Sequence, residues 1–275
     1  MDSKYLKIVI IVFLFAPNVL FSQTELSFTP KPDKEYFKSY FLDTRDIAVS
    51  PLKWDKKEWI IAGGTVGLTG FLYFNDKEVQ GYFQRNRTPF VDKTVKYGIE
   101  NWGDGTYSLP LLGLMYAYGL ISENNRSKKT ALLGTKAFII SGCIAQLVKF
   151  STHRHRPYEN SPADPYIWDG PSIKHKNLSF LSGHSATAFS IATIIASEYK
   201  DRKFIPIIAY SVAGLTALSR VYSNKHWASD VLFGSVVGYA IGKLIFNHNN
   251  WGIKLEPIMS SYFNGISISI PISEN

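Results

Sequence analysis

Six apolar segments fill most of the chain between residues 59 and 246, and each is long enough to form a helix. Their apolar residues do not alternate with polar ones at every second position, as they would in half-buried strands. The sequence therefore predicts an all-α fold, a helical bundle of about six core helices within a helical domain over residues 58–248. At 275 residues, the chain needs only one hydrophobic core. The six segments are residues 59–74, 107–122, 130–149, 185–199, 204–219 and 230–246.

The lengths of these segments are close to what a membrane-spanning helix needs. They run to about 15–20 residues, at or slightly below the ~20 that cross the hydrocarbon core. Apolar residues make up 45% of the chain, but mean hydropathy is near zero, so composition alone does not separate a membrane protein from a soluble one. Lys136 and Lys243 interrupt two segments, whereas 59–74, 107–122 and 204–219 carry no charge. The uncharged segments favour a membrane-embedded bundle, and a soluble bundle is the alternative.

The first 22 residues are typical of a secretory signal peptide. Lys4 and Lys7 precede an apolar stretch over residues 8–21, which is short for a stable span. We expect cleavage after Ser22, with an uncleaved anchor as the alternative. The segment predicts export, so the expected location is the inner membrane with a periplasm-facing site, or the periplasm as a soluble protein.

Basic connections between the segments give the expected orientation. Residues 126–129 and 200–203 are rich in Lys and Arg, and the positive-inside tendency places both in the cytoplasm. The opposite end of the bundle would then face outward. If the signal is cleaved and all six segments cross the membrane, that end would instead lie in the cytoplasm. Either the first segment lies peripherally and five helices cross, or the bundle is a soluble periplasmic one.

The two flanks of the bundle differ in character. Residues 23–57 form a polar lead-in with several prolines and room for one short helix. In the tail over residues 249–275, residues 266–270 alternate between Ile and Ser, and Asn264-Gly265 is a strong two-residue turn signal. The tail predicts a short C-terminal β-hairpin packed on the bundle, with a loosely ordered end as the alternative.

The formal charge of +8 favours anionic partners. Phosphorylated lipids and acidic membrane surfaces are partners of this kind. Nucleic acid is disfavoured, because the basic residues are scattered along the chain and form no long run.

Polar motifs rich in cations and histidine lie at the ends of the predicted helices. In an up-and-down bundle, the ends of the third and fifth helices meet the starts of the fourth and sixth, so the motifs would gather at one end. They are Lys149-x6-Arg156-Pro157, Ser182-Gly183-His184 and Ser219-Arg220-x5-His226-x3-Asp230.

In this order and spacing, the motifs resemble the tripartite signature of the type 2 phosphatidic acid phosphatases. Their superfamily also includes bacterial acid phosphatases and vanadium haloperoxidases. The resemblance covers about residues 58–246, and its specific part is confined to the motifs. Members usually have Pro before Ser-Gly-His, whereas Leu181 stands here. Because proline restricts the backbone, this departure bears on the rigidity of the loop.

The residue types fit phosphoryl transfer, which needs positive charge around the phosphate oxygens, a nucleophile and a proton donor. Lys149, Arg156 and Arg220 would bind the phosphate, since a planar guanidinium can pair with two oxygens. The backbone N–H groups of Ser182 and Gly183 and the Ser182 hydroxyl would add neutral donors at a helix N-terminus. We expect neither a metal ion nor a cofactor in this site.

The two motif histidines have different neighbours. Asp230 follows His226 by four residues, so both can share a helix face, where the carboxylate would orient the imidazole as a nucleophile. His184 has no carboxylate within sequence reach, and would protonate the leaving group and then activate water. The resemblance implies the same division. His153 and His155 form a His-x-His pair, but the cations that flank them argue against a metal site.

Together these observations predict a metal-independent phosphatase that hydrolyses phosphomonoesters or pyrophosphates through a phosphohistidine. Phosphorylated lipids are the expected substrates, and the resemblance allows phosphatidic acid, prenyl pyrophosphates, phosphatidylglycerol phosphate and lipid A phosphate. The alternatives are a soluble non-specific acid phosphatase acting on small phosphate esters, a vanadium-dependent haloperoxidase and a non-catalytic membrane scaffold. The sequence selects neither one substrate nor a protein partner.

Overall fold

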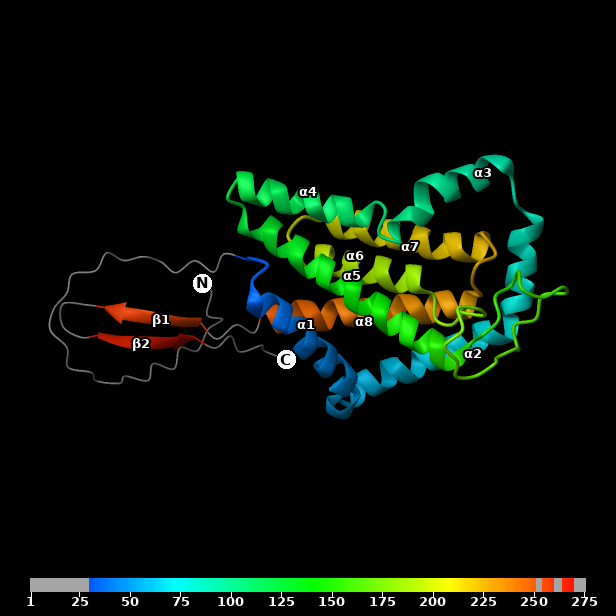
Figure 1. The fold of residues 1–275 in the computed structure, drawn as a ribbon, viewed down its shortest axis with the longest axis horizontal. Helices are drawn as coiled ribbons and strands as arrows, with labels where there is room; N and C mark the ends of the chain where they lie inside the picture. The colour runs from blue at the N-terminus through cyan, green and yellow to red at the C-terminus, as the bar shows by residue number, and fades with distance from the viewer. Residues whose placement is uncertain (1–29, 251–253, 260–263, 270–275) are drawn as a thin grey trace. The chain divides into compact units, whose positions relative to one another are not determined.

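The computed structural model describes residues 30–250, 254–259 and 264–269. All six predicted segments are helical, which confirms the all-α bundle (Figure 1). The predicted signal peptide lies outside the described residues. The helices are α1 Lys34–Val49, α2 Lys56–Arg85, α3 Pro89–Thr94, α4 Ser108–Ile121, α5 Asn125–Thr152, α6 Gly183–Glu198, α7 Phe204–Tyr222 and α8 Ala228–Asn250.

Helix α6 lies at the centre of the bundle and packs against both α5 and α7, while α4 packs on α5. Helix α8 also lies against α6, because glycines spaced four residues apart put no side chain between the two backbones. A Cβ at Gly234 would lie 2.6 Å from Ser182 O, and one at Gly242 would lie 2.7 Å from Ser190 O. Gly238, between them, has the same close contact with Ala186 O. The start of α6 is therefore held directly against α8.

Local signals in the sequence set the ends of the helices. The Asp55 side chain accepts from the Glu58 N–H and the Glu58 side chain from the Asp55 N–H, a capping box that starts α2. Asn124 caps α5 by accepting from Ser127 N. Helix α5 ends at Thr152, and its C-cap His153 has a left-handed backbone with φ of 44°. The chain therefore turns away from the axis of α5 four residues after Lys149.

The lead-in contains a longer helix than predicted, because α1 has a polar face with a specific partner. Lys136, in the middle of α5, is fully buried and donates to Asp43 Oδ2 at 2.7 Å and to Ser39 Oγ at 2.8 Å. The Tyr36 hydroxyl of α1 donates to Leu132 O at 2.9 Å. The pairing explains how a charged residue is accommodated within an apolar helix, since a buried charge must be neutralised and hydrogen-bonded.

Three helices of the described chain are long and apolar enough to cross a membrane: α5, α7 and the first 21 residues of α8. Helix α4 is apolar but shorter, and α2 is not among the candidates. Large apolar side chains on α7 face outward, with Phe204 77% and Leu218 55% exposed. Exposed apolar surface of this extent is typical of a lipid-facing helix. The described chain thus has the features of a membrane protein, and which helices cross stays a prediction.

Beyond the bundle, strands β1 Lys254–Met259 and β2 Asn264–Ser269 pair antiparallel. Asn264 pairs with Met259 and Gly265 with Ile258, so both residues of the expected turn lie within β2. The predicted position of the turn is therefore wrong. The alternating Ile and Ser residues form the strand itself, and residues 260–263, which join the strands, lie outside the described ranges. The prediction of a hairpin packed on the bundle stays a prediction.

Candidate active site

The helix ends that carry the motif residues lie at one end of the bundle, as predicted (Figure 1). Lys149 lies in the last turn of α5, and Arg220 in the last turn of α7. Ser182 is the N-cap of α6, and Asp230 lies in the first turn of α8. Because successive helices run in opposite directions, these ends are neighbours in space.

Arg220 is buried with incomplete hydrogen bonding. Only 5% of the residue is exposed, and within the described chain its Nε and Nη1 atoms have no hydrogen-bond partner. Nη1 lies 3.0 Å from Glu100 Oε2, an ion-pair distance without the alignment of a hydrogen bond. Glu100 also accepts from the Ser223 hydroxyl. Buried polar groups are normally paired, so this guanidinium has donors available for an anion.

The start of α6 combines a serine hydroxyl with a nearby ammonium group. Ser182 Oγ accepts from Ser185 N at 3.4 Å and from Ser185 Oγ at 2.9 Å. A Cβ on Gly183 would lie 3.4 Å from Lys149 Nζ, so the ammonium group lies close to the first turn of α6. The Ser182 N–H was predicted to bind phosphate, but it donates instead to Asp230 O at 3.1 Å. The Ser182 hydroxyl and the helix N-terminus remain as donors there.

His184 is held neutral by its surroundings. Burial lowers its pKa from 6.5 to about 3, and the charge of Arg220 adds to this effect, while Asp104 opposes it. The loop before α4 packs tightly on this residue, because a Cβ on Gly103 would lie 2.7 Å from His184 Cβ. The imidazole of His184 is therefore neutral near pH 7.

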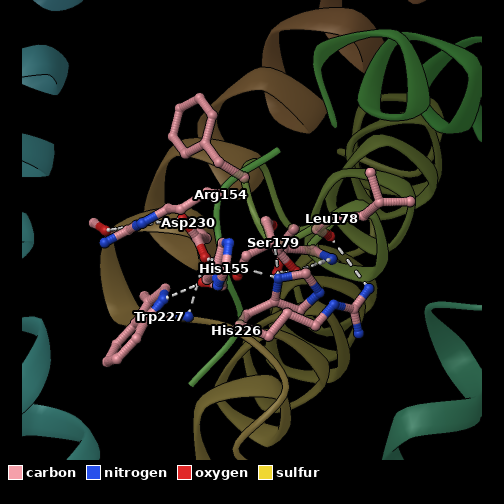
Figure 2. A network of polar contacts seen from close by, with 12 residues as sticks. Arg154, His155, Leu178, Ser179, His226, Trp227 and Asp230 are labelled. Atoms are coloured by element: carbon pink, nitrogen blue, oxygen red, sulfur yellow. Dashed lines mark hydrogen bonds and ion pairs between the residues drawn. The ribbon is translucent and has the colours of Figure 1, made fainter. Parts of the chain in front are cut away.

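His226 is 2% exposed and lies in the turn between α7 and α8. Its Nδ1 lies 2.8 Å from Ser179 O, while Asp230 Oδ2 is 3.9 Å away (Figure 2). A carbonyl can only accept, so Nδ1 carries the proton and the lone pair of the neutral ring is at Nε2. Burial lowers the pKa of His226 well below 6.5. The orienting hydrogen bond thus comes from Ser179, a residue that the sequence did not single out.

Asp230 is bound on both of its oxygens by other groups. Oδ1 accepts from Arg154 Nη1 at 2.5 Å, and Oδ2 accepts from Ser179 Oγ at 2.5 Å and from Trp227 N at 3.1 Å. Asp230 therefore acts on His226 partly through Ser179, because the hydroxyl of Ser179 bonds the carboxylate and its carbonyl bonds the imidazole (Figure 2).

Arg154 joins this network to α2. Its side chain is fully buried between Asp230 and Asp76, with Nη2 2.8 Å from Asp76 Oδ2. Asp76 in turn accepts from Ser229 N at 3.0 Å. The guanidinium carbon lies 4.8 to 5.5 Å from the ring centroids of three aromatic side chains, those of Tyr73, Trp168 and Trp227. The sequence placed Arg154 inside the first motif but did not predict its pairing with Asp76, since nothing in the sequence connects α2 with the motif.

Arg156 completes the group of cations. Its Nη2 donates to Leu178 O at 3.2 Å, which fixes the guanidinium against the loop before α6. The charges of Lys149 and Arg156 contribute to lowering the pKa values of both His184 and His226. Both imidazoles and the predicted cations therefore lie within one electrostatic environment.

The remaining motif histidines hold the loop in place. His153 contacts Phe150 O and Lys174 O at 3.1 and 2.9 Å, and His155 Nε2 lies 3.1 Å from Asp169 Oδ1. Among the described residues, no group of three or more His, Cys, Asp and Glu side chains could hold a metal ion.

Leu181 is 1% exposed and packs with Ala145 and Ala186 in the core. The loop is therefore anchored by the burial of Leu181, which stands where the signature that the chain resembles usually has proline.

Comparison with known proteins agrees with the motif pattern. The model of the PAP2 superfamily matches residues 131–253. A lipid A 1-phosphatase of Porphyromonas gingivalis is 48% identical over 67 residues, which cover 24% of this chain and 15% of that protein. Phosphatidylglycerophosphatase B of Bacillus subtilis is 29% identical over 168 residues, covering 58% of this chain and 74% of the relative.

A solved structure is also similar, that of a transmembrane PAP2 type phosphatidylglycerolphosphate phosphatase from Bacillus subtilis. It has a TM-score of 0.48 and 19% identity, and the match covers 82% of this chain and 97% of that one. The matched family region runs from α5 through α8 and contains the three motifs at the bundle end. Residues 131–253 of this chain thus match the PAP2 superfamily.

Proposed function

We propose that this protein is a metal-independent phosphatase that hydrolyses phosphomonoester or pyrophosphate groups of lipids through a phosphohistidine. The observation that carries the proposal is Arg220, which is 95% buried, has Nη1 paired with Glu100 at 3.0 Å and keeps Nε without a hydrogen-bond partner among the described residues, at the bundle end that holds His184 and His226. A phosphate would supply the missing acceptor. The relatives that are named as lipid A and phosphatidylglycerophosphate phosphatases support a lipid substrate.

In the first step, Nε2 of His226 attacks phosphorus while the bond from phosphorus to the leaving oxygen breaks. Lys149, Arg156 and Arg220 bind the equatorial oxygens, whose charge grows in the transition state. His184 transfers a proton to the leaving oxygen. In the second step, His184 takes a proton from water, the water oxygen bonds to phosphorus and the P–N bond breaks. Phosphate takes the proton from His184 and leaves as the monoanion, so both histidines return to their neutral forms.

The proton for the first step comes with the substrate. His184 has a pKa of about 3, so it is neutral in the free protein near pH 7. A phosphate monoester keeps one proton below its second pKa of ~6, and the bound phosphate charge offsets the cations that disfavour imidazolium. The monoanion can therefore pass its proton to His184 once bound.

The pH dependence of kcat/KM tests this proton inventory. For alkyl phosphates, whose leaving oxygen needs a proton, we expect kcat/KM to fall about tenfold per pH unit above the second pKa of the substrate, because the dianion brings no proton to His184. On the acid side, activity should persist below pH 6.5, since the lowered pKa of His226 keeps Nε2 unprotonated there. Substrates with different second pKa values should shift the alkaline limb accordingly. An alkaline limb at one fixed pH for all substrates would contradict the scheme.

Chelation tests metal independence. Hydrolysis of p-nitrophenyl phosphate should continue unchanged in excess EDTA, because the charge stabilisation comes from side chains. Vanadate should inhibit, since its five-coordinate form resembles the transition state of phosphoryl transfer. Activity that requires an added divalent metal would overturn the mechanism, and peroxide-dependent halide oxidation with vanadate would favour a haloperoxidase.

We further propose that the protein is exported and that the site end of the membrane-embedded bundle faces outward. The basic connections at residues 126–129 and 200–203 lie at the opposite end from the motifs, next to the start of α5 and the start of α7. A cysteine-reactive reagent that does not cross membranes would test this in a variant with Cys143→Ser and Tyr158→Cys. Tyr158 is 52% exposed in the loop of the site, so it should react in intact cells.

A further inference from the structure

An apolar cavity of about 200 Å³ lies between α4, α6 and α7. Alanine and isoleucine side chains form most of its wall, and Ser108 is its one residue with a hydroxyl group. On α6 the wall includes Ala188 and Ala192, and on α7 it includes Ala209 and Ala213. Small residues on both helices keep them from filling the space with their own side chains.

Both helices that line the cavity lead from it toward the candidate active site. Ala188 follows His184 by four residues on α6, so the two lie on one helix face. Ala213 precedes Arg220 by seven residues on α7, which is two helical turns on nearly the same face. Trp102 also lines the cavity, and its neighbour Gly103 packs on His184. One end of the cavity therefore lies one helical turn from His184 and two turns from Arg220.

A second cavity extends the first one away from the site. The two share Ile195 and Ile205, and the second reaches Tyr199 at the far end of α6. At the helical rise per residue, the distance along α6 from Ala188 to Tyr199 is about 17 Å. One leaflet of a bilayer has a hydrocarbon depth of ~15 Å, half of the whole core. The two cavities together, called the groove from here on, thus have the length of a single lipid chain.

We propose that this groove binds one hydrocarbon chain of the phosphorylated lipid whose phosphate lies at Arg220. The inference rests on the proposed function and deepens it. A cationic end and an apolar channel match an amphiphile with an anionic headgroup. A helix of a protein partner does not fit, because a helical cylinder ~10 Å wide and this long occupies more than ~1,000 Å³.

The test compares one substitution on two substrates. Ala209→Phe places a bulky side chain in the groove, whereas Ala117→Phe places the same side chain on the exposed face of α4, outside both cavities. Hexadecyl phosphate in detergent micelles probes the groove, and p-nitrophenyl phosphate does not. The substrate partitions into micelles to the same extent for a variant and for the wild type, so this partition does not affect the ratio of their kcat/KM values on one substrate.

We expect Ala209→Phe to lower kcat/KM on hexadecyl phosphate at least about tenfold, since several methylene groups lose their contacts. Its activity on p-nitrophenyl phosphate should be unchanged, as should both activities of Ala117→Phe. Ala192→Leu, on the facing wall, provides a milder variant should Ala209→Phe fail to fold. An equal loss on both substrates, or no loss on either, overturns the groove and leaves the proposed function standing. A wild type inactive on both substrates would refute the proposed function itself.

Discussion

Replacing His226 with Ala is expected to reduce phosphatase turnover at least about 10³-fold, because the proposed nucleophile is removed. The fold should survive, since the backbone of this turn is fixed by hydrogen bonds from Lys225 N and His226 N to Arg220 O. His175→Ala, in an exposed part of the loop, removes a histidine outside the site and should retain full activity. Release of p-nitrophenolate by the purified variants measures both.

A second experiment uses His184→Ala to trap the phosphohistidine intermediate on His226. p-Nitrophenolate leaves without a proton, so His226 should still be phosphorylated, whereas hydrolysis lacks its base. Labelled phosphate should therefore accumulate on the protein in a form that is stable in alkali and labile in acid. The label should be absent from a variant that also carries His226→Ala. A phosphoprotein that persists in this double variant would show that another residue is the nucleophile.

Removing Arg154 is expected to produce the largest loss of stability of any single change in this region. Arg154→Met leaves the carboxylates of Asp76 and Asp230 buried without their common cation. Breaking a buried ion pair in this way destabilises by about 3–5 kcal/mol, far more than an exposed pair contributes. Thermal unfolding in detergent, followed by circular dichroism, should detect a clear fall in midpoint.

The control for this result is Arg45→Met, which disrupts an ion pair whose Arg45 side chain is 59% exposed. It should change stability by less than about 1 kcal/mol. Adding Asp76→Asn to Arg154→Met should recover part of the stability, because one of the two uncompensated charges is removed. If Arg154→Met unfolds at the same temperature as Arg45→Met, the ion-pair network does not stabilise the bundle end.

Much of the fold could be predicted from the sequence because the information was local. Unbroken apolar segments mark α4 and α7, and motif residues such as Lys149 and Asp230 mark helix ends. A helix end restricts where the side chain can lie, and an up-and-down bundle then brings such ends together. The gathering of the motif residues followed from these facts alone.

The contacts that sequence reasoning missed join residues far apart in the chain. Asp76 lies in α2 and reaches Arg154 across the fold, and Glu100 reaches Arg220 from the loop before α4. Each is an ordinary polar residue in its local context. The length of α1 was underestimated for the same reason, since its polar face is complementary to Lys136, which lies some 90 residues later in the chain. Such pairings depend on packing, which local patterns do not encode.

The glycines of α8 have a mechanical consequence for the chemistry. Because Gly234 and Gly242 bring the α8 backbone onto that of α6, neither helix can slide or tilt without steric overlap. His184 is on α6, and His226 directly precedes α8, so the two imidazoles belong to one stiff frame. Any opening that admits a substrate must then come from the covering parts of the bundle end, such as the loop before α4, while the reacting groups stay in register.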